Sequence, residues 1–95
     1  MVGQFRRGDR HVHRLIAGEH LLINLRRAGS ESFYSLSPSA AALWDALVDW
    51  TSVDALVEQL QRAYEVTEAE ASADVEEFLA HLTELEAVDF RKAEL

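Results

Sequence analysis

The sequence predicts an α+β domain in which a three-stranded antiparallel sheet is followed by three helices. Before Pro38, short apolar runs are separated by turn residues, which is typical of strands joined by hairpins. After Pro38, apolar residues recur every three or four positions, which is typical of amphipathic helices. Because the strands come first and the helices afterwards, we expect the helices to gather on one side of the sheet.

Three strands are predicted, over residues 11–16, 20–25 and 31–36. The first connection holds Gly18 and the second holds Gly29, and glycine is a residue that tight hairpin loops favour. Strands that follow each other this closely tend to pair as an antiparallel meander. The first and third strands are then the two edges of the sheet.

Ser37 and Pro38 mark the change from strand to helix. Proline at the first helical position costs no hydrogen bond, and the serine before it can cap the first turn. This first helix is expected to run from Pro38 to about residue 49.

Two further helices are expected, over about residues 53–64 and 68–87. Thr51 with Asp54 and Thr67 with Glu70 have the spacing of capping boxes at the starts of these helices. Each helix has a single apolar stripe, so all three are expected to surround one shared core. The best candidates for that core are Trp44, Leu47, Leu60, Phe78 and Leu82.

The length of 95 residues fits one domain with a modest core. We expect residues 1–10 and 91–95 to be flexible, because both ends are rich in polar and charged residues. The chain has no cysteine, which excludes disulfides and thiolate metal sites. No apolar run approaches the roughly 20 residues of a membrane helix, and no signal segment is recognisable. A cytoplasmic protein without membrane contact is the expectation.

The net charge of −8 is unevenly distributed along the chain. Residues 1–37 carry six arginines against three carboxylates, whereas residues 38–95 carry three basic residues against fourteen acidic ones. Binding to a phosphate backbone depends on basic residues that displace counterions. The acidic helical half therefore argues against nucleic acid as a partner.

The residues that carry chemistry in enzymes do not form a convergent pattern in this sequence. His11 and His13 share one face of the first strand, but no third metal ligand is evident. Ser35 lacks a neighbouring base, and a solvated helix face explains glutamates such as Glu76 and Glu84. A glycine-rich phosphate loop is absent as well. We therefore expect no enzyme activity, no metal and no cofactor.

The third strand is a sheet edge without the usual protection. Native edges are commonly guarded by charged residues or proline. The first strand carries Arg14 and two histidines, but residues 32–36 carry neither charge nor proline. Such an edge can accept an extended peptide as a further strand, with main-chain hydrogen bonds for affinity and side-chain pockets for specificity. Two alternatives are that the third helix covers the edge or that it pairs with a second copy in a homodimer.

Three segments of the chain follow one another in a recognisable order. They are Leu36-Ser-Pro-Ser-Ala40 with the following Ala-Ala-Leu-Trp44, a second helix that ends at Tyr64, and Asp74-Val75-Glu-Glu-Phe78-Leu79-Ala-His-Leu82. This succession resembles the PqqD-like family, also called RiPP recognition elements after the ribosomally made, modified peptides they serve. The likeness covers about residues 11–90. Ser37 replaces the family's asparagine and keeps its capping role, while Asp49-Trp50 and Glu86-Ala87 stand where glycines are common.

The resemblance implies a winged-helix-like fold and a non-catalytic protein that binds the leader segment of a precursor peptide. It implies that the leader adds to the third strand, beside the third helix, and that the core peptide is presented to a modifying enzyme. That enzyme would be a radical-SAM protein, or a leader protease with a cyclase in lasso-peptide systems.

The resemblance also implies which residues contact the leader. The receiving strand comprises Ser32, Phe33, Tyr34, Ser35 and Leu36. The groove wall comprises Asp74, Glu77, Phe78, His81 and Leu85, which share one side of the third helix. Phe78 and Leu85 also belong to the apolar stripe of that helix, so core and contact are alternative roles for them.

The third helix carries carboxylates along its length and no lysine or arginine. We therefore expect a leader with at least one basic residue near the groove. The same acidity argues against the rival interpretation as a winged-helix DNA-binding regulator, whose recognition helix must lie beside phosphates. A small acidic protein-interaction partner of another kind, structural or toxin-neutralising, is the second alternative.

Overall fold

The computed structural model describes residues 3–25 and 33–92. Its strands are β1 (Gly3–Arg7), β2 (His11–Ile16), β3 (Glu19–Asn24), β4 (Phe33–Leu36), β5 (Thr51–Ser52) and β6 (Val88–Lys92). Its helices are α1 (Pro38–Ala46), α2 (Val53–Ala63) and α3 (Glu68–Glu84). A strand meander followed by three helices confirms the α+β class predicted from the sequence.

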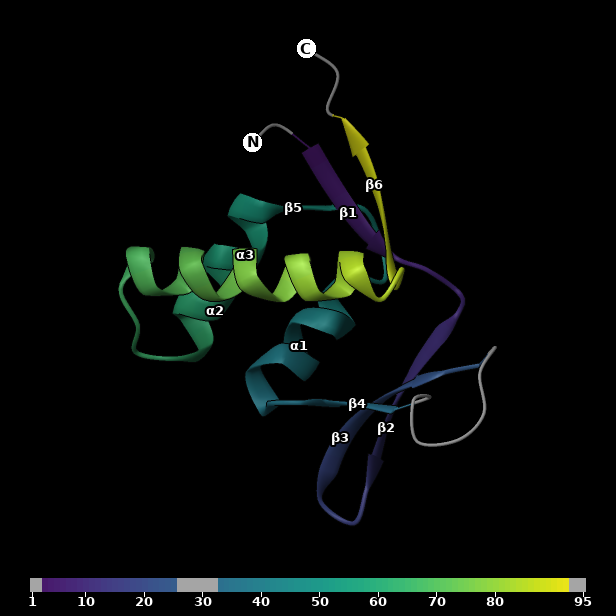
Figure 1. Cartoon of the computed structure of the whole chain (residues 1–95). Helices are drawn as coiled ribbons and strands as arrows, with labels where there is room; N and C mark the ends of the chain where they lie inside the picture. The colour runs from purple at the N-terminus through teal and green to yellow at the C-terminus, as the bar shows by residue number, and fades with distance from the viewer. Residues whose placement is uncertain (1–2, 26–32, 93–95) are drawn as a thin grey trace.

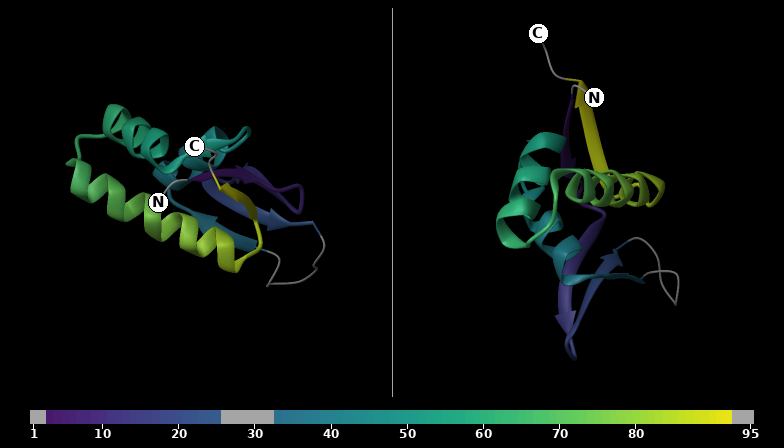
Figure 2. Two further views of the ribbon diagram at one scale, coloured as in Figure 1. Left: turned by 90° about the horizontal axis from the view of Figure 1, so that it is seen from above. Right: turned by 90° about the vertical axis from the view of Figure 1, so that its left-hand side faces the viewer.

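Two three-stranded sheets, ordered β2-β3-β4 and β5-β1-β6, lie at opposite ends of the molecule (Figure 1). Helix α3 runs across the molecule between them, and α2 packs along it. The two further views show the β2-β3-β4 sheet projecting beyond the helices (Figure 2). This arrangement leaves β4 beside α3, with α1 starting where β4 ends.

The β2-β3-β4 sheet is the predicted antiparallel meander. A two-residue turn of Ala17 and Gly18 joins its first two strands, and both residues have positive φ values of 52° and 82°. This left-handed turn matches the natural twist of paired strands. The predicted start of the third strand at residues 31–32 lies outside the described residues.

The second sheet, β5-β1-β6, was not predicted from the sequence. The polar ends of the chain predict flexibility at residues 1–10 and 91–95, whereas residues 3–7 form β1 between β5 and β6, and β6 extends to Lys92. Phe5 explains the difference, because it is buried and its ring packs against the ring of Phe90, with 5.0 Å between the ring centroids. The partners of β1 come from much later in the chain, and local periodicity carries no information about such pairing.

The helix starts follow the capping rules with one correction. Ser37 Oγ accepts a hydrogen bond from the Ala40 N–H at 3.1 Å, as predicted, and Thr67 caps α3 in the same way. At α2, however, Ser52 is the capping residue. Thr51 instead uses its hydroxyl to close the turn after α1, which ends at residue 46 rather than near residue 49.

The core lies among the three helices and the helix-facing side of the sheets. All five predicted core side chains are buried, and Leu22, Leu36 and Leu56 join them. Within the described ranges, no helix has both the length and the apolar character needed to cross a membrane.

His11 is the one polar side chain buried within the described residues, and its Nδ1 has no hydrogen-bond partner there. Burial, together with the charge of neighbouring Arg10, lowers the pKa of His11 below the ordinary histidine value of 6.5. The unfolded chain therefore binds this proton more readily than the folded one. The free energy of unfolding should consequently fall as the pH drops through 6.5 towards the lower folded-state pKa.

Urea unfolding measured at several pH values between about 7.5 and 5.5 tests this expectation. The wild-type protein should lose more stability over this range than a His11→Asn variant, whose residue 11 does not titrate. Equal pH dependence in the two proteins would show that His11 is not the group responsible.

Candidate functional site

Strand β4 forms one edge of the β2-β3-β4 sheet, and among the described strands it pairs only with β3. The direction of its main-chain groups can be derived from the neighbouring ladder. The Leu25 N–H donates to the Arg10 carbonyl at 2.7 Å, one residue beyond the ends of β2 and β3. Arg10 and Leu25 are thus a hydrogen-bonded pair, and such pairs alternate with non-bonded pairs along an antiparallel ladder.

This alternation determines which residues of β4 bond to β3. Counting back from Leu25, the odd-numbered residues of β3 bond to β2, so the even-numbered residues bond to β4. The even-numbered residues Leu22 and His20 lie opposite Tyr34 and Leu36. Tyr34 and Leu36 therefore direct their N–H and C=O groups towards β3.

Phe33 and Ser35 have the opposite orientation. Their N–H and C=O groups point away from β3, towards the outer edge of the sheet. No strand within residues 3–25 and 33–92 pairs with that edge. The structure thus offers a short row of main-chain donors and acceptors to an additional strand.

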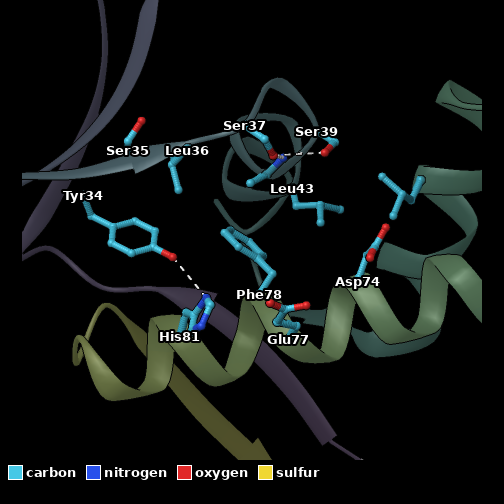
Figure 3. A pocket seen from close by; sticks show the side chains of 12 residues that line it. Tyr34, Ser35, Leu36, Ser37, Ser39, Leu43, Asp74, Glu77, Phe78 and His81 are labelled. Atoms are coloured by element: carbon cyan, nitrogen blue, oxygen red, sulfur yellow. Dashed lines mark hydrogen bonds between the residues drawn. The ribbon is translucent and has the colours of Figure 1, made fainter.

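A groove of about 330 Å³ runs between this edge and α3. Its lining residues are Tyr34, Ser35, Leu36, Ser37, Ser39, Ala40, Leu43, Leu60, Asp74, Glu77, Phe78 and His81. The apolar part of the lining is formed by the buried side chains of Leu36, Leu43, Leu60 and Phe78 and by the partly buried Ala40. Figure 3 shows Leu36 and Phe78 directed towards each other in the middle of the groove.

The two ends of the groove differ in chemistry (Figure 3). At one end, the Tyr34 hydroxyl and His81 Nδ1 are joined by a hydrogen bond of 3.0 Å that links β4 to α3. Asp74 lies at the other end, and Glu77 projects from α3 between them. Both carboxylates are exposed, and no ion pair joins either to a cation within the part of the chain that the structure describes.

The structure brings most of the predicted contact residues together and separates others. Tyr34, Ser35, Leu36, Asp74, Glu77, Phe78 and His81 line the groove. Phe33 lies on β4 but its side chain is 52% exposed and does not line the groove. Leu85 caps the end of α3 and packs against the core, and Ser32 lies outside the described residues.

The groove residues contributed by the first two helices were not predicted from the sequence. Ala40 and Leu43 come from α1, and Leu60 comes from α2. Their three- and four-residue spacing identified them as apolar helix positions. Which of these positions reaches β4 depends on how the helices pack, and the pattern does not contain that information.

The histidines of the β2-β3-β4 sheet have different surroundings. His11 is buried in the core, while His13 Nε2 lies 2.9 Å from His20 Nδ1 and His13 Nδ1 lies 3.5 Å from an Asp45 oxygen. Within the described residues, no group of three or more histidines and carboxylates is arranged to hold a metal ion.

The family comparison agrees with the order of motifs in the chain. The model of the family described as "Coenzyme PQQ synthesis protein D (PqqD)" matches residues 19–88. The chain belongs to the PqqD family. A comparison of this PqqD-family chain with curated proteins found no match.

Three solved structures share the fold of this PqqD-family protein. "Lasso peptide synthetase B1 complexed with the leader peptide" has a TM-score of 0.72 and 22% identity, covering 90% of this chain and 96% of that one. "TbiB1 in Complex with the TbiA(beta) Leader Peptide" has a TM-score of 0.72 and 20% identity, covering 94% and 99%. The PqqD truncation of PqqCD from Methylobacterium extorquens, a stand-alone RiPP recognition element, has a TM-score of 0.71 and 19% identity, covering 90% and 88%.

Proposed function

We propose that this protein binds the leader segment of a ribosomally made precursor peptide and delivers the precursor to a modifying enzyme in the cytoplasm. The leader adds as a strand to the outer edge of β4, and its alternate side chains enter the groove against α3. The protein itself is not a catalyst. The receiving enzyme is a radical-SAM protein, or a leader protease with a cyclase.

The observation that carries this proposal is that a strand edge with which no described strand pairs lies beside a side-chain groove. Phe33 and Ser35 offer main-chain groups, and the apolar centre of the groove lies directly beside them. Strand addition uses these two features together, the first for affinity and the second for specificity. Membership in the PqqD family and the two similar B1 structures, both with leader peptides, support the same assignment.

The geometry gives less support to the alternatives. A recognition helix for DNA must approach phosphates, and α3 presents Asp74 and Glu77 on the side that faces the groove. A homodimer through β4 would use the same edge as the leader. It would therefore compete with peptide binding and make the affinity for peptide depend on protein concentration.

Titration of the ¹⁵N-labelled protein tests the proposal. The ligands are synthetic N-terminal segments of the short open reading frames that flank its gene. One of them should shift the amide resonances of β4 and the groove side of α3, with small changes elsewhere. Binding of a random DNA duplex, or peptide-induced shifts confined to other surfaces, would contradict the proposal.

A further inference from the structure

We propose that the groove selects guest segments in which a lysine or arginine stands two residues before a large apolar residue. This inference rests on the proposed function and concerns the chemistry of the peptide that the same site takes. It is carried by the direction of the β4 main chain, the apolar centre of the groove and two exposed carboxylates, Asp74 and Glu77, that form no ion pair within the described residues.

The β4 main chain determines which guest side chains enter the groove. A guest strand bonds to Phe33 and Ser35, so its residues opposite Tyr34 and Leu36 occupy non-hydrogen-bonded positions. At such positions the two strands approach most closely, with Cα atoms about 4.5 Å apart. Tyr34 and Leu36 both line the groove, so the guest residues opposite them point into it as well.

The guest residue opposite Leu36 meets the apolar centre of the groove. Leu36 has 6% of its surface exposed, and Phe78 on α3 has 7%. Together with Leu43 and Leu60, these side chains make up the buried apolar part of the groove lining. A large apolar side chain gains the most from this position, because it leaves water without losing polar contacts.

The spacing of two residues follows from the geometry of a strand and a helix. Two residues of a strand span about 6.6 Å, and four residues of an α-helix span about 6 Å. Asp74 precedes Phe78 by four residues along α3, and both line the groove. A guest side chain two residues from the apolar one therefore reaches the carboxylate of Asp74, with Glu77 beside it.

The charge of that guest side chain follows from the free carboxylates. Neither Asp74 nor Glu77 forms an ion pair within the described residues, and both are exposed. A lysine or arginine complements them and orients the guest in the groove, while contributing modestly to affinity.

The order of the two residues follows from strand direction. β4 runs from the Tyr34 end of the groove towards the Asp74 end (Figure 3). Both ladders of this sheet are antiparallel, and antiparallel pairing is the more stable kind per residue. An antiparallel guest passes Asp74 first and Leu36 two residues later, so the basic residue precedes the apolar one.

Selection from a phage-displayed library of random twelve-residue peptides tests this inference. The wild-type protein is the selection target. Peptides that also bind the folded Ser35→Pro protein or the Phe33→Pro protein are discarded, because they do not use the β4 edge. The retained peptides should be enriched in a basic residue followed, after one intervening residue, by a large apolar one. A retained pool without this spacing, or with the reverse order, overturns the inference while the proposed function stands. If every selected peptide binds the proline variants as well as the wild-type protein, both this inference and the proposed function fail.

Charge variants test the role of the carboxylates with a selected peptide. The double variant Asp74→Asn with Glu77→Gln should weaken binding about fivefold, as expected for exposed charge pairs. The matched control Glu76→Gln with Glu84→Gln, on exposed positions of α3 outside the groove, should stay within about twofold. Raising the salt concentration from low to physiological should weaken peptide binding to the wild-type protein. It should weaken peptide binding to the Asp74→Asn, Glu77→Gln double variant less. Equal effects of the two double variants, or affinity that is independent of salt, would contradict the charge assignment.

Discussion

A Ser35→Pro substitution is expected to weaken peptide binding strongly while leaving the free protein folded. The Ser35 N–H points away from β3, so proline removes no hydrogen bond from the sheet of the free protein. It does remove a donor to the guest strand and places a ring where that strand would approach. Loss of the hydrogen bond alone costs about 1 kcal/mol, and the steric conflict adds to it, so affinity should fall at least about tenfold. Isothermal titration with a leader peptide measures the effect.

Two matched variants separate this effect from general damage. Ser35→Ala keeps the N–H and should bind nearly as well as the wild-type protein. Tyr34→Pro removes a donor that bonds to β3, so it should disrupt the sheet and lower the melting temperature, in contrast to Ser35→Pro. Undiminished affinity in a folded Ser35→Pro protein would mean that the guest does not add to this edge.

A Trp44→Ala substitution is expected to cause the largest loss of stability. Trp44 lies on α1 with 1% of its surface exposed and is the largest of the fully buried side chains. Its truncation leaves a cavity among the helices and should cost about 3–5 kcal/mol. Because a domain of this size has about 5–15 kcal/mol of stability, the variant should be largely unfolded in mild denaturant. Urea unfolding followed by far-UV circular dichroism measures the loss.

Val48 provides the control for this measurement. It lies just after α1 with 62% of its surface exposed, so Val48→Ala should change the free energy of unfolding by less than about 0.5 kcal/mol. A loss below about 1 kcal/mol for Trp44→Ala would show that the helices do not pack around this side chain as described.

The parts of the fold that depend on neighbouring residues could be predicted from the sequence. The strand-to-helix change at Ser37 and Pro38 and the cap at Thr67 are set within a few residues, and the structure confirms both. The sheet formed by β1, β5 and β6 was beyond such reasoning. Its strands come from the two ends and the middle of the chain, and Phe5 is a single apolar side chain in a polar segment.

The candidate site shows the same division. Asp74, Phe78 and His81 lie on one side of α3, and helical spacing alone places them together. The contributions of Leu43 and Leu60 depend on how three helices pack against β4, so the pattern did not reveal them. The outward direction of Ser35 depends on the register of two ladders, and only the structure supplies that register.

Amide hydrogen exchange of β4, measured with and without a bound leader peptide, tests the central claim most directly. In the free protein, the N–H groups of Tyr34 and Leu36 should exchange slowly, while those of Phe33 and Ser35 exchange fast. Saturation with peptide should slow exchange at Phe33 and Ser35 and leave the other two slow. Protection of Phe33 and Ser35 before any peptide is added, or fast exchange that persists at saturation, would contradict the account.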